Sequence, residues 1–142
     1  MKSSIFVYTG MVILLFFGSC KEEGAPGTTD IAGTYSYMGY DTNGVQISNG
    51  SLLLTRNGSQ LSGVLKILGS LNVDSVGGTI TGSDSIDLNL NPHKATNYLV
   101  FLRGVITNGT IRGDIYSYLY DPPIGGRTGR FVAIRAEIDR VL

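Results

Sequence analysis

Alternation of apolar and polar residues is the feature that most constrains the fold of this chain. In SIDLNL, residues 85–90, Ile86, Leu88 and Leu90 fall on one face and polar residues on the other, which is typical of a strand with one buried side. No segment beyond the first 19 residues keeps a helical period over a stable length. Twenty glycines and four prolines, spread in short groups, indicate many turns. The sequence therefore predicts an all-β domain.

Turn-forming residues separate the alternating runs. Asn57-Gly58 and Asn108-Gly109 each stand between two such runs, and Asn-Gly accepts the positive φ angles that a tight hairpin requires. Residues 68–72 and 81–85 are two further turn candidates. The pattern predicts eight strands, at 32–40, 45–56, 59–68, 72–81, 84–91, 96–107, 109–120 and 127–138.

The number of strands and their short connections limit the architecture. Eight consecutive antiparallel strands either leave two edges exposed or close on themselves, and closure removes the edges. We therefore expect an eight-stranded antiparallel up-and-down β-barrel, with a β-sandwich as the alternative. A barrel of this size has room for side chains or for one small ligand. Gly63 and Gly113 fall inside expected strands, where glycine permits the sharp bends of a small barrel.

The first 19 residues have the composition of a secretory leader. Lys2 is the only charged residue before Cys20, and residues 5–17 are almost wholly apolar. This run is too short to span a hydrocarbon core, which needs about 20 helical residues. Gly18 and Ser19 supply the small residues that a signal peptidase requires. We expect residues 1–19 to be removed as a signal peptide.

Cys20 is the only cysteine, and it directly follows this leader. The arrangement resembles the bacterial lipobox, which implies that the chain is cut before Cys20, that the cysteine is lipidated and that acyl chains hold the protein to a membrane. The alternative, an ordinary secreted protein, would keep an unpaired thiol in an oxidising compartment. Each buried methylene contributes about 0.8 kcal/mol, so two or three acyl chains anchor a protein stably.

Three charged residues, Lys21, Glu22 and Glu23, follow the cysteine. They resemble the export signal of Bacteroidota lipoproteins, which implies a cell-surface position on the bacterial outer membrane. The alternative is that they are only the solvated start of a tether. In either case we expect residues 20–29 to form a flexible tether and residues 30–142 to form the β-barrel domain.

Short segments in the first, third and last expected strands share a pattern with a known group of barrels. They are GTYSY at 33–37, LSG at 61–63 and GRFVAIR at 129–135. They resemble the calycin-like barrels, the group that contains lipocalins and avidin-like proteins, over about residues 32–138. Both groups usually carry a tryptophan in the first strand, where this chain has Tyr35, so their ligands are not carried over to it.

The charge balance argues against nucleic acid as a partner. Removal of Lys2 with the leader leaves 10 basic against 11 acidic residues, without the basic excess that phosphate binding requires. Beyond the lipid on Cys20, the sequence offers no argument for a membrane contact.

No residue cluster in the sequence announces a reaction, so we expect no catalytic residues, no metal, no cofactor and no enzymatic activity. His93 is the only histidine and lies in the turn-like NPHK. Asp74, Asp84, Asp87 and Asp114 lie on or beside expected strands, where outward-facing aspartates are common. Two carboxylates about 5 to 10 Å apart would suffice to cleave a sugar, and such an enzyme is the third functional alternative.

Tyrosines supply the feature that invites a ligand. Tyr35 and Tyr37 alternate in the first strand, and Tyr116 and Tyr118 alternate in the seventh. In a closed eight-stranded meander the eighth strand pairs with both, so we expect the two rows to form one aromatic stripe. Tyrosine is also simply a good strand residue. The sharper interpretation is a recognition face of rigid rings with hydrogen-bonding tips.

Residues 121–130, DPPIGGRTGR, are expected to form a loop beside this stripe, where Arg127 and Arg130 can meet an acidic group. The sequence thus favours a surface-anchored, non-catalytic binding module for a small molecule, glycan or peptide. The alternative is a protein inhibitor or assembly module that inserts this loop into the cleft of another protein. An open barrel interior would favour the first function, and a filled interior would favour the second.

Replacement of Cys20 by alanine tests the membrane anchor. Cys20→Ala should release the protein from the membrane fraction and leave the precursor uncut, because the acyl chains have no other attachment point. Fractionation of cells and the mass of the product measure both effects. A variant that stays in the membrane fraction would mean that another anchor exists.

Overall fold

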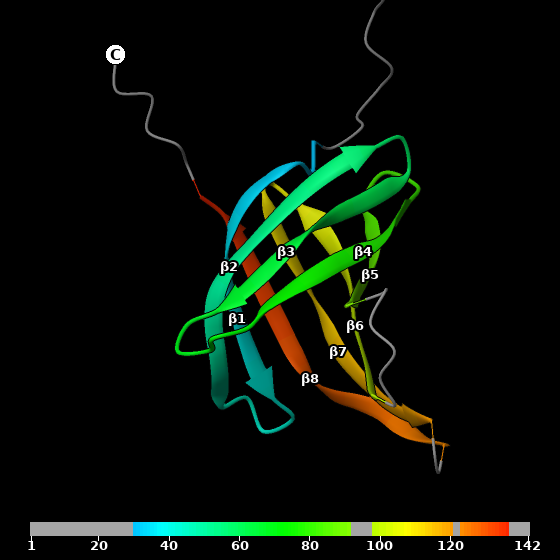
Figure 1. Cartoon of the computed structure of the whole chain (residues 1–142). Coiled ribbons are helices and arrows are strands. Elements are labelled where there is room, and N and C mark those ends of the chain that lie inside the picture. Colours follow the sequence, from blue (N-terminus) through cyan, green and yellow to red (C-terminus); the bar gives the residue numbers. More distant parts are fainter. Residues whose placement is uncertain (1–29, 92–97, 121–122, 137–142) are drawn as a thin grey trace, which may run out of the picture.

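The computed structural model describes residues 30–91, 98–120 and 123–136, and these form a closed barrel of eight antiparallel strands (Figure 1). Each strand pairs with the next along the chain, and β8 pairs with β1. The strands are β1 (Gly33–Asp41), β2 (Gln46–Asn57), β3 (Gln60–Ile67), β4 (Val73–Thr81), β5 (Ser85–Leu90), β6 (Tyr98–Thr107), β7 (Thr110–Tyr120) and β8 (Pro123–Arg135). The predicted up-and-down barrel is confirmed, and the sandwich alternative is wrong.

The expected leader and tether, residues 1–19 and 20–29, lie outside the described residues, as do Cys20 and His93. Within the described part of the chain there is no helix that is long and apolar enough to cross a membrane.

The last strand begins four residues earlier than the sequence predicts. Residues 123–126 pair with β7, so the segment expected as a loop is a strand except for its first two residues, which are outside the described range. Gly125 pairs with Tyr118 in the ladder, and the ring of Tyr118 occupies the space that a side chain at position 125 would need. Pro123 stands at the first position of β8, where a missing N–H is tolerated.

The two Asn-Gly pairs predicted to form hairpins, Asn57-Gly58 and Asn108-Gly109, do so, but they take different positions in the turn. Asn108 (φ 48°) and Gly109 (φ 71°) are the two central residues between Thr107 and Thr110, as in a type I′ turn. In the first hairpin Asn57 still pairs with Gln60, so Gly58 (φ 62°) takes the first central position. Only the second pair therefore uses the tolerance of asparagine for positive φ.

The core lies inside the barrel and is closed at the end where the chain enters. Ile31 is fully buried at this end, and the Tyr35 hydroxyl donates to the Ile31 carbonyl oxygen at 2.7 Å. At the same end the Arg135 guanidinium donates to the carbonyl oxygens of Asp30, at 2.9 Å, and Ala32. The opposite end carries the β1–β2 and β3–β4 connections (Figure 1). We call these the closed end and the turn end.

Inward-facing glycines allow adjacent strands to approach closely where the wall bends. A Cβ atom on Gly63 would overlap the carbonyl oxygen of Leu53 on β2, and one on Gly113 would overlap that of Arg103 on β6. These two positions are the ones that the sequence predicts as bends. Gly126, in contrast, has no atom within 4 Å of a Cβ position.

Substitution of Gly63 by alanine should therefore destabilise the barrel. We expect Gly63→Ala to lower the free energy of unfolding by about 1–3 kcal/mol, because the new methyl group must displace the backbone of β2. Gly126→Ala is the matched control and should change it by less than about 0.5 kcal/mol. Urea unfolding of the mature chain carrying Cys20→Ala measures both, and equal losses would refute the close-approach argument.

Candidate functional site

The barrel interior is filled by core side chains. Tyr35 and Phe131 are buried inside it, and the ring of Tyr37 stacks on that of Phe131 with centroids 6.1 Å apart. Ile67, Leu90 and Ile115 pack against this core towards the turn end. A filled interior leaves no room for a captured molecule, and by the criterion stated above it favours the inhibitor or assembly module. A binding function therefore requires a site on the outer wall.

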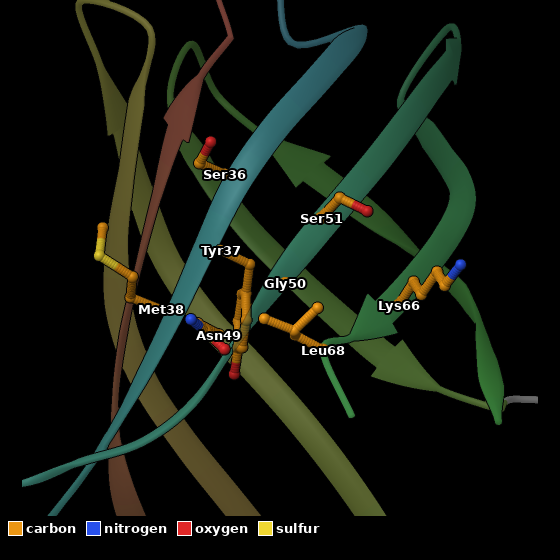
Figure 2. Close-up of a pocket in the computed structure, with 8 residues that line it drawn as sticks. All are labelled: Ser36, Tyr37, Met38, Asn49, Gly50, Ser51, Lys66 and Leu68. Atoms are coloured by element: carbon orange, nitrogen blue, oxygen red, sulfur yellow. The ribbon is translucent and has the colours of Figure 1, made fainter. Parts of the chain in front are cut away.

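A groove of about 520 Å³ crosses the outer wall over β1, β2 and β3 (Figure 2). Gly50 lies at its centre as the pairing partner of Tyr37 on β1 and of Ile67 on β3, and a Cβ atom on it would overlap the Lys66 carbonyl oxygen, so β2 and β3 approach closely at this point. The residues that line the groove are Ser36, Tyr37, Met38, Asn49, Gly50, Ser51, Lys66 and Leu68.

Two rows of outward-facing residues form the sides of this groove. In one row, Ser51 pairs with both Ser36 and Lys66. In the other, Met38 pairs with Asn49, and the Leu68 N–H donates to the Asn49 carbonyl oxygen at 2.8 Å. One side of the groove is therefore polar with a single cation, and the other presents a thioether and a leucine with Asn49 between them.

Charge and burial give the groove its chemical character. The ion pairs found among the described residues join Asp87 to Arg103, Asp114 to Arg127 and Asp30 to Arg135, and Lys66 takes part in none of them. Burial raises the pKa of the Tyr37 hydroxyl, which a hydrogen bond with Ser48 partly offsets. Tyr37 thus stays neutral at ordinary pH, and Lys66 is the charge that a ligand in this groove would meet.

The wall beside the groove is unusually apolar. Leu71 is fully exposed (103%), and Leu68 is 75% exposed, both in the β3–β4 connection at the turn end. Exposed patches of this kind often mark interaction sites. We name this surface the β2–β4 apolar face, and it consists of Ile47, Leu53, Val64, Leu68, Leu71 and Val73.

The sequence contained a signal for this face that our prediction did not use. In LLL, residues 52–54, Leu52 and Leu54 are buried, so Leu53 must be outward where alternation calls for a polar residue. The turn LGSLNV, residues 68–73, likewise carries three large apolar residues where turns are normally polar.

The predicted tyrosine stripe does not exist. Tyr35 and Tyr37 point into the barrel and are 0% and 4% exposed, whereas Tyr116 and Tyr118 lie on the outer wall. Alternation correctly placed each pair on one face of its strand, but it could not say whether that face was the inner or the outer one. Of the four, Tyr37 borders the groove, and Tyr35 is part of the core.

The predicted rim at 121–130 is also wrong, because both arginines stand on strand β8. Arg127 does meet an acidic group, but it is Asp114 of the same chain, with Nε 2.5 Å from Oδ1. Arg130 is exposed on the outer wall and pairs across strands with Asp114 on β7 and Tyr40 on β1.

Three of the four carboxylates considered for catalysis, those of Asp74, Asp87 and Asp114, are held by neighbouring side chains. Asp74 accepts from the Asn91 side-chain amide at 2.7 Å, and Asp87 accepts from the Arg103 Nε at 2.9 Å. Among the described residues, no group of three or more histidine, cysteine, aspartate or glutamate side chains could hold a metal ion.

Comparison with known proteins gives likeness in fold alone. No protein-family model and no curated protein sequence matches this chain. A redesigned β-barrel is similar with a TM-score of 0.56 and 17% identity, over 75% of this chain and 92% of that one. EF1p2_mFAP2b bound to DFHBI follows at 0.52 and 12%, over 75% and 94%. A shwanavidin–biotin complex is similar at 0.46 and 14%, over 76% and 99%. The chain thus has the closed eight-stranded barrel that the sequence predicts.

Substitution of Tyr35 by phenylalanine tests its place in the core. Tyr35→Phe should lower the free energy of unfolding by about 1 kcal/mol, since the buried Ile31 carbonyl loses its donor. Burial raises the pKa of Tyr35 above its ordinary value of 10.0, so the folded state keeps the proton longer than the unfolded state. The contribution of the Tyr35 proton to the free energy of unfolding should therefore be fully present below pH 10 and be lost as the pH rises above it. This loss should be smaller in Tyr35→Phe than in the unsubstituted protein.

The control for this measurement is Tyr118→Phe, which keeps the ring contact with Phe101. It should change the free energy of unfolding by less than about 0.5 kcal/mol. Urea unfolding between pH 7 and pH 11 compares the variants. A loss as large in the control would contradict the structural role assigned to the Tyr35 hydroxyl.

Proposed function

We propose that this protein is a lipid-anchored, non-catalytic binding module that takes an amphipathic ligand in the β1–β3 groove. The observation that carries the proposal is the groove over Gly50, in which one unpaired lysine faces an apolar side. Its volume of about 520 Å³ lies within the range of small-molecule sites.

The ligand class follows from the two sides of the groove. An apolar body would be removed from water against Met38 and Leu68, with a gain of roughly 25 cal/mol for each Å² buried. An anionic group on the same ligand would meet Lys66, and neutral polar groups would meet the hydroxyls of Ser36 and Ser51. The ligand is therefore an apolar molecule that carries one acidic group.

Barrels of this fold are able to bind small molecules. EF1p2_mFAP2b, which resembles this chain in fold, is a complex with DFHBI. This supports a binding function as a class, and the choice of the groove rests on the residues of this chain.

The proposed anchor agrees with the position of the groove. If Cys20 is lipidated, residues 20–29 span at most about 36 Å before the chain enters the closed end. The turn end, with Leu68 and Leu71, then points away from the membrane. We propose that Lys21, Glu22 and Glu23 direct the protein to the cell surface, where protease added to intact cells should cleave it.

A second candidate function has an observation of its own. The exposed Leu68 and Leu71 make the β3–β4 connection an apolar tip, which suits insertion into the cleft of another protein. This connection takes the place of the 121–130 segment in the inhibitor or assembly hypothesis. Leu71→Ser would abolish such an interaction and leave the groove intact, because Leu71 does not line the groove.

Two dyes that share an aromatic body test the groove. Anilinonaphthalene sulfonate carries an anion, and N-phenylnaphthylamine does not. In the mature chain carrying Cys20→Ala, Lys66→Gln should weaken binding of the sulfonate about tenfold and leave the neutral dye unchanged, since an interaction with a charged group contributes about 1.5 kcal/mol. Leu68→Ser should weaken both dyes.

Fluorescence titration measures these affinities. Ile134→Ser is the matched control, because Ile134 is an exposed apolar residue on β8 that does not line the groove. The groove is the wrong site if the affinities for both dyes survive Lys66→Gln and Leu68→Ser in a folded protein.

A further inference from the structure

A second hollow, of about 530 Å³, lies on the outer wall where β7, β8 and the end of β1 meet. Arg112 on β7 and Arg130 on β8 both line it, together with Tyr40 and Gly113. Arg112 pairs with Val132, two residues beyond Arg130, so the two arginines are diagonal neighbours on one face. Diagonal neighbours stand about 7–8 Å apart, within reach of long side chains.

The nearby carboxylates are already engaged by other groups. Asp114 lines the hollow, but its Oδ1 accepts from Arg127 Nε at 2.5 Å. Asp41, at the end of β1, accepts the backbone N–H groups of Asn43 at 2.9 Å and Val45 at 2.8 Å. Within the described residues, neither acid forms an ion pair with Arg112 or Arg130.

Arg103 lies on the same half of the outer wall, and its contacts serve as a comparison because its charge is paired. Its Nε donates to Asp87 at 2.9 Å, and its guanidinium carbon lies 5.5 Å from the ring centroid of Phe101 and 5.3 Å from that of Tyr116. Within the described part of the chain, Arg112 and Arg130 make no such ion pair or ring contact.

We propose that Arg112 and Arg130 form an oxyanion site that takes a sulfate, phosphate or carboxylate group of a ligand. Two guanidinium groups present forked donors that match such oxygens, and they stay charged at every physiological pH. Tyr40 lines the same hollow, and its hydroxyl donates only a long, weak hydrogen bond to Met38 Sδ at 3.6 Å, which it can exchange for one to the anion.

The net charge of the protein would not by itself attract an anion to this hollow. Without Lys2 the chain carries 10 basic and 11 acidic residues, so its net charge does not favour anions. The positive field is local, because four outward arginines, at 103, 112, 127 and 130, face only two carboxylates, Asp87 and Asp114. Binding should consequently weaken with added chloride as screening increases.

Titration with inorganic sulfate, followed by nuclear magnetic resonance of the arginine side-chain Nε–H signals, tests the site. In the mature chain carrying Cys20→Ala, sulfate should shift the signals of Arg112 and Arg130 and leave those of Arg103 and Arg127 in place. Acetate in a parallel titration separates a preference for a tetrahedral anion from one for a planar carboxylate.

Three substitutions and one control decide the assignment. Arg112→Gln and Arg130→Gln should each weaken sulfate binding at least fivefold, and Arg112→Lys should weaken it less because the charge remains. Arg56→Gln removes an arginine near the closed end and should change the affinity less than twofold. Equal shifts at all arginines, or an affinity that survives both Arg112→Gln and Arg130→Gln in a folded protein, would overturn the proposal.

Discussion

The pairing of β1 with β8 is the constraint on which the rest of the structure depends. Seven residue pairs, from Tyr35 with Arg135 to Asp41 with Gly129, close the sheet and leave no exposed edge in the barrel. Once the sheet is closed, every residue is either inward or outward. Closure at eight strands also makes the interior narrow, so Tyr35, Tyr37 and Phe131 are enough to occupy much of it. A ligand would therefore have to bind on the outer wall.

Local pattern was sufficient to predict the strands and most of their bounds, because alternation and turn residues act within a few positions of the chain. The failures concern what closure decides. Tyr35 and Tyr116 lie in equally alternating segments, and only the pairing of β1 with its neighbours turns the first into a core residue and leaves the second outside. Gly125 was assigned to a loop because its place in β8 depends on the ring of Tyr118 on β7, a contact between strands that no local pattern contains.

The site was harder to predict than the fold for a related reason. Outward residues carry no packing constraint, so their chemistry varies freely around the barrel, and here it divides into two halves. Leu53 and Val64, paired across β2 and β3, belong to the apolar half. Asp87 and Arg103, paired across β5 and β6, belong to the charged half. Each of these residues alone is an ordinary surface residue. The apolar and charged halves are recognisable only once the strand register shows which outward residues are neighbours.

Strand β1 separates the two proposed sites and connects them. Its outward residues Ser36 and Met38 line the groove, whereas Tyr40, the next outward residue, lines the oxyanion hollow. β1 is paired on both sides, with β2 and with β8, so it is a rigid partition and does not act as a hinge. The contact between the Tyr40 hydroxyl and Met38 Sδ at 3.6 Å runs along β1 and joins one residue of each site. The spacing between the two sites is therefore fixed by the same ladders that close the fold.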